Sequence, residues 1–299
     1  MYKLPFVDSP PSLTAKRVKF IVDGVNNASA QHGLRLQDTV LVLNTWDEPR
    51  CTKSLHCTMP VFSLIKQWDW RAGRGLQSDV LLPFFSHFYG DVIDTPWDEK
   101  IGKALMRAAA QNGMHRNCTR LWLLELARSH PVGQRLLDVG ITNNLKKGLK
   151  VDTADYVDIP SHAKWKYLLS TDGFTASCRF GKLLQTNSVV LKEESRWIEY
   201  YYRSVHAGTH FYSFTKDNVL QVLLRLEASP PSELQSVTRS AQAFGYRHLS
   251  TAAKALYVAR VIELHNACFQ GVMEFVAGLP DGAARSLDAL LDAARVWRA

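Results

Sequence analysis

The sequence of 299 residues lacks several features that would each identify a class of protein. No stretch of 18 or more residues is free of charge, so we expect no transmembrane helix in this chain. Its first 20 residues contain no apolar h-region, so no signal peptide is recognisable. There is also no Walker motif, no G-x-G-x-x-G and no Ser-His-Asp elbow. The sequence therefore disfavours P-loop NTPases, dinucleotide-binding proteins of the standard pattern and serine hydrolases.

Metal-binding patterns and long basic tracts are also missing. The five cysteines do not have the spacing of a zinc site, and their odd number excludes a fully paired framework. Cys51 and Cys57 could form a local disulfide if the compartment is oxidising. The histidines are scattered, so we predict no metal site. The net charge of +8 is spread thinly along the chain, which favours a mildly basic surface over a nucleic-acid partner.

The first part of the chain is predicted to contain short strands and then two helices. Continuous apolar runs predict strands at 39–44, 59–65 and 79–85, after a helical stretch at 15–25. The period then changes, and helices are expected at 97–111 and 117–130, with Pro96 before the first helix and Thr119 as the N-cap of the second.

The second part alternates regularly between strands and helices. Strands are expected at 167–170, 188–191 and 210–214, and each is followed by a helix, at 175–185, 196–203 and 218–227 respectively. Short connections between alternating elements are typical of a parallel α/β sheet. Long helical stretches at 232–248 and 251–276 and an amphipathic helix at 281–299 are predicted to follow.

The segment "STDGFTASCRF" (170–180) joins a predicted buried strand to a predicted helix. In a parallel α/β unit this junction faces the ligand crevice. Thr175 could cap the helix, Ser177 could donate its hydroxyl, and the fork of donors on Arg179 suits phosphate oxygens. Gly173 lets the backbone approach a ligand closely. The alternative is a capped helix whose Arg179 reaches a surface carboxylate.

Two further groups of residues could carry chemistry. Asp47 follows the first predicted strand, where a carboxylate can act as a general base, although ordinary turn chemistry before Pro49 explains it equally well. Arg107, Arg116 and Arg120 lie on and between two predicted helices. A cation in the first helical turn, such as Arg120, opposes the helix dipole unless an anion pairs with it. A solvated helix face is the alternative for these arginines.

Several blocks of the sequence resemble, in order, the Rumi/CAP-type glycosyltransferases of glycosyltransferase family 90, which include the protein O-glucosyltransferases. The strongest block is "KYLLSTDGFTASCRFGKLLQTNSVVLKEESRWIEYYYRSVHAGTHFYSF" (166–214). The other blocks are 79–83, 96–108, 117–127 and 241–249, and the likeness extends over residues 38–265.

The resemblance implies an α/β, GT-B-like fold in which two Rossmann-like halves face a cleft, with long C-terminal helices. On this basis we expect an acceptor-side half at 1–95, which looks short, and a donor-binding half at 96–254. Helices at 255–299 would pack back across the halves. The resemblance further implies an inverting, metal-independent transfer of a hexose or pentose from a UDP-sugar to a hydroxyl on a protein or glycan. It also implies the secretory pathway, in the lumen of the endoplasmic reticulum or Golgi. No cofactor beyond the donor substrate is expected.

The resemblance assigns roles to residues that match the family's pattern. Asp47 matches the base that accepts the proton of the acceptor hydroxyl. Positions matching the donor-binding turn and its surroundings are Gly173, Phe174, Thr175, Ala176, Ser177, Cys178 and Arg179, with Arg107, Arg120, Ser86, Phe88, Tyr89 and Gly90.

The sequence also departs from the family in places. The family's Trp/Phe-Arg-Gly-Ser reads Met106-Arg107-Ala108-Ala109, and its Pro-Trp before the last strand reads Ala207-Gly208. Ala109 removes a hydroxyl that helps to hold the nucleotide, and Ala108 restricts a backbone that glycine leaves free. The alternative function is therefore a non-catalytic relative that binds a carbohydrate or nucleotide without turnover.

Overall fold

The computed structural model describes residues 11–37, 39–52, 57, 60–85, 89–111, 118–145, 147–268, 271 and 274. The chain forms two compact units. Unit 1 comprises Met1–Leu64, Gln77–Ser86 and Thr251–Ala299, and unit 2 comprises Ile65–Leu76 and His87–Ser250. The predicted domain boundary at residue 95 assigns residues 1–95 to one half. In the structure, residues 65–76 belong to the second unit instead.

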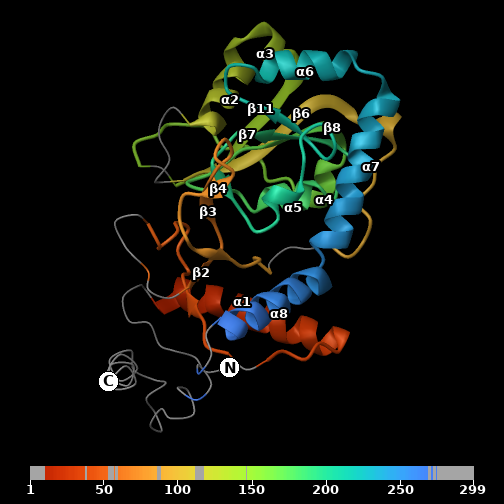
Figure 1. Ribbon diagram of the computed structural model, residues 1–299. Coiled ribbons are helices and arrows are strands. Elements are labelled where there is room, and N and C mark those ends of the chain that lie inside the picture. The colour runs from red at the N-terminus through yellow and green to blue at the C-terminus, as the bar shows by residue number, and fades with distance from the viewer. Residues whose placement is uncertain are drawn as a thin grey trace. The chain divides into compact units, whose positions relative to one another are not determined.

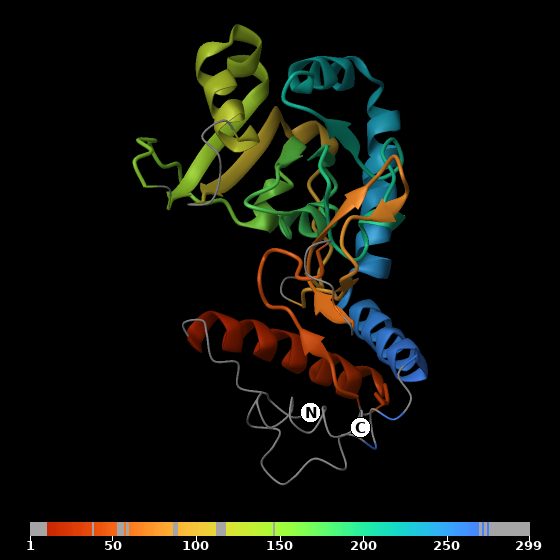
Figure 2. The ribbon, with the colours of Figure 1, turned by 60° about the vertical axis from the view of Figure 1, so that its left-hand side comes forward.

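Unit 1 combines a small parallel sheet with two long helices. Its elements are α1 (Pro11–His32), β1 (Val42–Leu43), β2 (Val61–Ser63), β5 (Val80–Leu81) and α8 (Thr251–Cys268). The strands lie in the order β1-β2-β5 and all pair in parallel, so the three strands predicted here are confirmed, though each is shorter than expected. Helices α1 and α8 lie side by side (Figures 1 and 2). Cys51 and Cys57 form a disulfide with a Cα–Cα distance of 5.5 Å.

Unit 2 is built around a five-stranded parallel sheet. Its strands are β6 (Ile101–Ala110), β7 (Leu137–Asn144), β8 (Trp165–Ser170), β9 (Val189–Glu193) and β11 (Tyr212–Phe214). They lie in the order β11-β9-β8-β6-β7, and every pair is parallel. The first strand therefore lies between the second and the third, which is a doubly wound arrangement with a switch point between β6 and β8.

Helices cover both faces of this sheet. They are α2 (Thr119–Ser129), α3 (Pro131–Leu136), α4 (Ile159–His162), α5 (Arg179–Leu183), α6 (Val219–Ala228) and α7 (Pro231–His248). Helices α2, α3 and α6 lie on one side of the sheet and α4 and α5 on the other (Figure 1). Buried Met106, Leu123, Tyr167 and Leu223 belong to one apolar cluster that joins the sheet to the first group of helices. Burial of this cluster supplies the main driving force for the layered structure.

A second, smaller sheet belongs to unit 2. It is antiparallel and has the order β10-β3-β4, formed by β3 (Lys66–Asp69), β4 (Arg74–Gly75) and β10 (Trp197–Ile198). Two short 3-10 helices complete the unit, η1 (Trp97–Glu99) and η2 (Tyr202–Ser204). The prediction of an α/β fold is thus confirmed, with a parallel sheet in each unit and long helices near the C-terminus. The facing of the two halves stays a prediction.

The predicted helix at 97–111 was wrong, because residues 101–110 form the strand β6 at the centre of the sheet. Alanine, leucine and methionine favour helices when isolated, and this composition misled the prediction. The segment is paired on both sides, with β7 and β8, and Leu105 and Ala108 are buried. Tertiary packing on both faces therefore overrides the local propensity.

Several other elements differ from expectation. The predicted helix at 196–203 was wrong, since this segment contains β10 and η2. The helix expected at 175–185 is only α5, residues 179–183, so Thr175 does not cap it. Cys118, not Thr119, occupies the N-cap of α2. Helix α3 and strand β7 were missed because residues 133–153 carry a weak apolar pattern, and helix α4 was missed because it has only four residues.

The remaining predicted helices hold in outline. Helices α6, α7 and α8 confirm the stretches expected at 218–227, 232–248 and from 251 onward. The amphipathic helix predicted at 281–299 lies outside the described residues. Among the residues described, no helix is both long and apolar enough to span a bilayer.

Candidate active site

The candidate site lies at the switch point of the unit 2 sheet. Ligands of doubly wound sheets bind outside the carboxyl ends of the strands where the order reverses, here β6 and β8. Strand β6 ends at Ala110 and is followed by Gln111, while β8 ends at Ser170 and leads into the turn 171–178. The topology therefore brings the predicted turn to the position where a ligand crevice is expected.

Arg120, in the first turn of α2, is one of two cations at this position. It is only 4% exposed, and its guanidinium donates to Thr171 Oγ1 at 3.2 Å and to the Ala109 carbonyl at 2.7 Å. Burial, together with the nearby charge of Arg179, lowers the pKa of Arg120 to about 10. No carboxylate forms a salt bridge with Arg120 among the described residues.

Arg179 is the second cation, at the first residue of α5. Burial also lowers the pKa of Arg179 below its ordinary value. Its Nη1 is buried and has no hydrogen-bond partner among the residues described. An unpaired buried donor on a charged group is costly, so Arg179 is a candidate to contact an anion.

The turn between β8 and α5 is fixed by local contacts. The Gly173 amide donates to the Thr175 carbonyl at 2.8 Å, and the Phe174 amide donates to Gln111 Oε1 at 2.9 Å. Gly173 is needed because a Cβ there would lie 2.3 Å from Gln111 Oε1 and 3.0 Å from Arg120 Nη2. Since α5 has only five residues, the two arginines, not the end of a helix, supply the positive charge.

The carboxylates beside the turn already have other partners. Asp172 Oδ1 accepts a hydrogen bond from Lys192 Nζ at 2.8 Å in a largely buried salt bridge. Glu193 Oε2 accepts from the Asp172 amide at 2.9 Å, and Glu193 Oε1 accepts from the Thr119 hydroxyl. These contacts hold both acids in place around the turn, which leaves Arg120 and Arg179 as the available cations.

A third basic group, His162 of α4, lies near Arg179 and was missed by the sequence analysis. It is 2% exposed, and burial lowers its pKa, with the charges of Arg179 and Arg107 acting in the same direction. Its Nδ1 lies 2.7 Å from the Asp158 carbonyl, so Nδ1 carries the proton and donates. Its Nε2 is buried without a partner among the described residues, and in the neutral ring this atom is an acceptor.

Arg107 lies on strand β6 and not on a helix. It forms a salt bridge with Asp138 at 2.7 Å and also donates to the Asp138 carbonyl at 2.9 Å. Its Nε is buried and unpaired within the described part of the chain. Arg107 is thus held mainly by the protein itself, in contrast to Arg179.

The other predicted donor-binding residues are placed as follows. The backbone of Tyr89 exchanges two hydrogen bonds of 3.3 Å with the side chain of Gln185. Burial raises the pKa of the Tyr89 phenol. Gly90 follows it in an exposed position. Ser86, Phe88 and Arg116 lie outside the described residues. Within the turn, Thr175 is buried, Ala176 and Ser177 are half-buried, and Phe174 and Cys178 are exposed.

Asp47, the predicted base, lies in unit 1 after β1. Its Oδ1 accepts a hydrogen bond from Arg17 Nη2 at 2.8 Å, in a half-exposed salt bridge. Arg17 also donates to the Thr45 carbonyl and so ties the segment after β1 to helix α1. The ion pair fixes the direction of the carboxylate.

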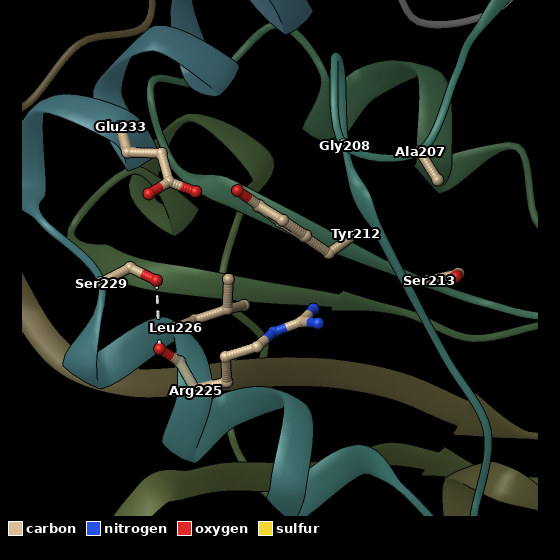
Figure 3. A pocket seen from close by; sticks show the side chains of 8 residues that line it. All are labelled: Ala207, Gly208, Tyr212, Ser213, Arg225, Leu226, Ser229 and Glu233. Carbon is tan, nitrogen blue, oxygen red and sulfur yellow. Dashed lines mark hydrogen bonds between the residues drawn. The ribbon is translucent and has the colours of Figure 1, made fainter.

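A separate pocket of about 440 Å³ lies elsewhere in unit 2, beside β11, the end of α6 and the start of α7 (Figure 3). It lies near the amino end of β11, whereas the arginine site lies at carboxyl ends of strands. Glu233 and the Tyr212 hydroxyl point toward one another, with Arg225 below the tyrosine ring (Figure 3). One acid and one base balance its charge, so it does not offer the net positive charge that a diphosphate needs. Ala207 and Gly208, which replace the family's Pro-Trp, form part of its wall.

The sequence carried few signals for some of these residues. Gln111 and Thr171 stand at the ends of strands, which was a usable signal once β6 was known to be a strand. His162 precedes a strand and belongs to no motif, and only its burial and unpaired Nε2 reveal it. No group of three or more His, Cys, Asp or Glu that could hold a metal occurs in the described part of the chain. Metal independence stays a prediction.

Comparison with known proteins gives related transferases. Residues 12–270 match the family described as Glycosyl transferase family 90. Protein O-glucosyltransferase 1 of Rattus norvegicus is 27% identical over 241 residues, which cover 72% of this chain and 59% of that protein. The O-glucosyltransferase rumi of Drosophila melanogaster is 26% identical over 201 residues, which cover 59% of this chain and 46% of that protein.

Solved structures are more distant. Anabaena HepE in complex with UDP-glucose aligns with a TM-score of 0.44 and 11% identity, over 65% of this chain and 60% of that chain. The pneumococcal O-GlcNAc transferase GtfA in complex with UDP and GlcNAc aligns with a TM-score of 0.44 and 10% identity, over 68% of this chain and 45% of that chain.

The chain spans 59% of the length of the rat relative, so the matched region is a part of that protein. The family match, by contrast, extends over most of this chain. The protein therefore belongs to glycosyl transferase family 90.

Proposed function

We propose that this member of the family transfers a hexose or pentose from a UDP-sugar to a hydroxyl on a protein or glycan, with inversion and without a metal ion. The observation that carries the proposal is the pair of arginines at the switch point, of which Arg120 is buried and Arg179 is half-buried with a buried Nη1. Arg120 and Arg179 lie close enough for one charge to lower the other's pKa, and Arg179 Nη1 has no partner within the described residues.

A diphosphate would resolve this unfavourable arrangement. Two neighbouring cations repel each other and have lost the solvation of water, so an anion between them gains from both. The leaving group of a UDP-sugar is UDP, whose negative charge grows as the glycosidic bond breaks. Arginines placed in a buried site stabilise that growing charge without having to reorganise.

The surroundings of the arginines suit the rest of the donor. The neutral His162 offers Nε2 as an acceptor for a hydroxyl or an N–H of the nucleoside. The turn from Gly173 to Cys178 and the segment at Tyr89 and Gly90 would line the donor, and Ser86 and Phe88 remain candidates from the sequence. Arg107 would act beside this site, held in place by Asp138.

Asp47 is the proposed base. An acceptor hydroxyl is a poor nucleophile, and a carboxylate within hydrogen-bond distance can take its proton during attack. Attack from the side opposite UDP in one step inverts the anomeric carbon. The salt bridge with Arg17 would orient Asp47 for this role.

The names of the relatives support a protein as the acceptor, because several are protein O-glucosyltransferases. The Cys51–Cys57 disulfide supports an oxidising compartment, as the secretory pathway provides.

The test of the reaction is release of UDP from UDP-glucose and UDP-xylose, measured for the wild type, Asp47→Asn and the control Glu48→Gln. Loss of a general base slows the reaction by about 100-fold or more, so Asp47→Asn should lose at least that much while Glu48→Gln keeps its rate. Equal turnover in wild type and Asp47→Asn would remove Asp47 from the role of base. UDP binding without any release by the wild type would favour the second candidate function.

That second candidate is a non-catalytic relative, and one observation favours it. At position 109, where the family carries a serine hydroxyl, the chain has alanine, and only its backbone carbonyl contacts Arg120. A weakened hold on the nucleotide would follow from the missing hydroxyl.

A further inference from the structure

The antiparallel sheet β10-β3-β4 of unit 2 presents tryptophans and arginines that the proposed reaction does not use. Trp70 is 52% exposed although its indole Nε1 donates to the Ser195 carbonyl at 2.9 Å. Its ring meets the ring of Trp68 edge to face, with centroids 6.4 Å apart. The exposed tryptophan is therefore held in one orientation by a hydrogen bond and a neighbouring ring.

Arginines surround these rings. The guanidinium of Arg203 lies 4.8 Å from the centroid of Trp68. The Trp68 amide donates to the Arg196 carbonyl at 2.7 Å, so the strand register places these two residues opposite each other, with their side chains on one face. Arg196 and Arg203 are exposed, and neither forms a salt bridge with a described residue. We call Trp68, Trp70, Arg196 and Arg203 the Trp–Arg surface.

The acidic residues of the same segments are fewer than the exposed arginines: Glu194 is exposed, and the Asp69 carboxylate lies near Arg196 and Arg74. Asp69 Oδ1 is used by the turn, where it accepts from the amides of Arg71 and Ala72 at 3.0 Å each. Arg71 and Arg74 in that turn are exposed and add to the positive charge. Glu199 is buried. The outward charge of the sheet is therefore positive, which favours a partner with an acidic surface.

The Trp–Arg surface is connected to the donor turn. Arg203 lies in η2 beside Tyr202, whose hydroxyl lies 3.5 Å from the Ser177 carbonyl. Lys192 Nζ, the amine that forms the salt bridge with Asp172, also lies over the Tyr202 ring, 5.9 Å from its centroid. A molecule docked on the surface would therefore lie one residue away from the side chain that supports the donor turn.

We propose that the Trp–Arg surface docks an acidic polypeptide, namely the protein acceptor of the transfer, and this inference rests on the proposed function. Tryptophan and arginine dominate the binding energy of protein interfaces, and a rigid tryptophan loses little entropy on binding. The patch has two rings and a few cations on short strands, whereas nucleic acid is bound by long stripes of positive charge.

The test compares a double variant of the surface with a matched control. Trp70→Ala/Arg196→Glu removes one exposed ring and reverses one exposed charge. Trp122→Ala/Arg239→Glu makes the same changes on α2 and α7, where Trp122 is exposed and its Nε1 donates to the Lys216 carbonyl at 3.3 Å. The probe is poly-L-glutamate, with heparin and oligothymidylate as competing polyanions, and UDP calorimetry reports the donor site.

The wild type should bind poly-L-glutamate, and raising the salt from low to physiological strength should weaken binding because the charges are exposed. The surface variant should bind about 10-fold or more weakly, since hot-spot residues each contribute that much or more. The control should keep its affinity, and both variants should bind UDP as the wild type does. Equal loss in both variants, or binding of heparin or oligothymidylate in preference to poly-L-glutamate, would overturn the proposal. If the wild type itself does not bind UDP, that result would instead contradict the proposed function.

Discussion

At the scale of single residues, the account depends on groups that lack a partner. Arg179 Nη1 and His162 Nε2 are buried and unpaired within the described residues, although buried polar atoms are usually satisfied. Arg120 and Arg107 use their donors on carbonyls and on Asp138. Arg107 Nε is unpaired there as well, but Asp138 holds the rest of that guanidinium, so Arg179 and His162 are the first candidates to contact a ligand.

Gly173 gives the first prediction at this scale. In Gly173→Ala the new Cβ would meet Gln111 Oε1 and then Arg120 Nη2, so Gln111 must move and the guanidinium shifts with it. We expect UDP affinity to fall by about 10-fold, the effect of disturbing one hydrogen bond to a charged group, with a small change in stability.

Calorimetry with UDP checks this result, and Gly102→Ala is the control because a Cβ at Gly102 meets nothing within 4 Å. Unchanged UDP affinity in Gly173→Ala would show that Gly173 and Arg120 lie away from the nucleotide.

At the scale of elements, the sequence predicted the strands β8 and β9 better than the strand β6, which lies beside β8 in the sheet. The strands β8 and β9 and the helices α6 and α7 follow clear apolar patterns and were found where expected. Strand β6 has the composition of a helix, and only its pairing with β7 and β8 makes it a strand. Local sequence cannot report such pairing, because the partners lie far away along the chain.

The candidate site follows the same division. The turn 173–179 and Arg120 were predicted from the sequence, since their residue types at a strand end indicate an anion site, and their role stays a prediction. The expected cap at Thr175 was wrong because α5 begins four residues later. His162 could not be found, because its role depends on burial and on an unpaired nitrogen.

Lys100 gives a prediction about the elements it joins. Its Nζ donates to Asn187 Oδ1 at 2.6 Å, to Ser188 Oγ at 3.2 Å and to the Ala163 carbonyl, which ties the start of β6 to the segments before β8 and β9. Burial lowers the pKa of Lys100 to about 8. Between about pH 8 and pH 10.5 the unfolded chain still binds the proton that the folded protein has lost. The free energy of unfolding contributed by this group should therefore rise with pH across that window.

Urea unfolding at pH 7 and pH 10 measures this contribution in the wild type and in Lys100→Met. The change in unfolding free energy between the two pH values should be larger in the wild type, by on the order of 3 kcal/mol, because the other titrating groups cancel. Lys103→Met is the control, since the hydrogen bond from Lys103 Nζ to the Gln134 carbonyl, at 3.1 Å, lies at the surface. The same pH dependence in wild type and Lys100→Met would refute the lowered pKa.

At the scale of the whole molecule, the two units carry different parts of the proposed reaction. Unit 2 contains the arginines, His162 and the Trp–Arg surface, while unit 1 contains Asp47 and the disulfide. Under the proposed function, we expect most donor contacts to come from unit 2, and we expect transfer to depend on Asp47 of unit 1 as well. Ligand binding stabilises the state that binds it, so UDP should stabilise unit 2.

The central claim is that Arg179 holds the diphosphate of the donor, and calorimetric titration with uridine and UDP tests it most directly. The wild type should bind UDP more tightly than uridine. Arg179→Ala should weaken UDP binding by about 10- to 100-fold, as expected for loss of a charge-assisted contact, and uridine binding by less than about 2-fold. Equal affinity of wild type and Arg179→Ala for UDP, or no binding of UDP to the wild type at millimolar concentration, would contradict the account.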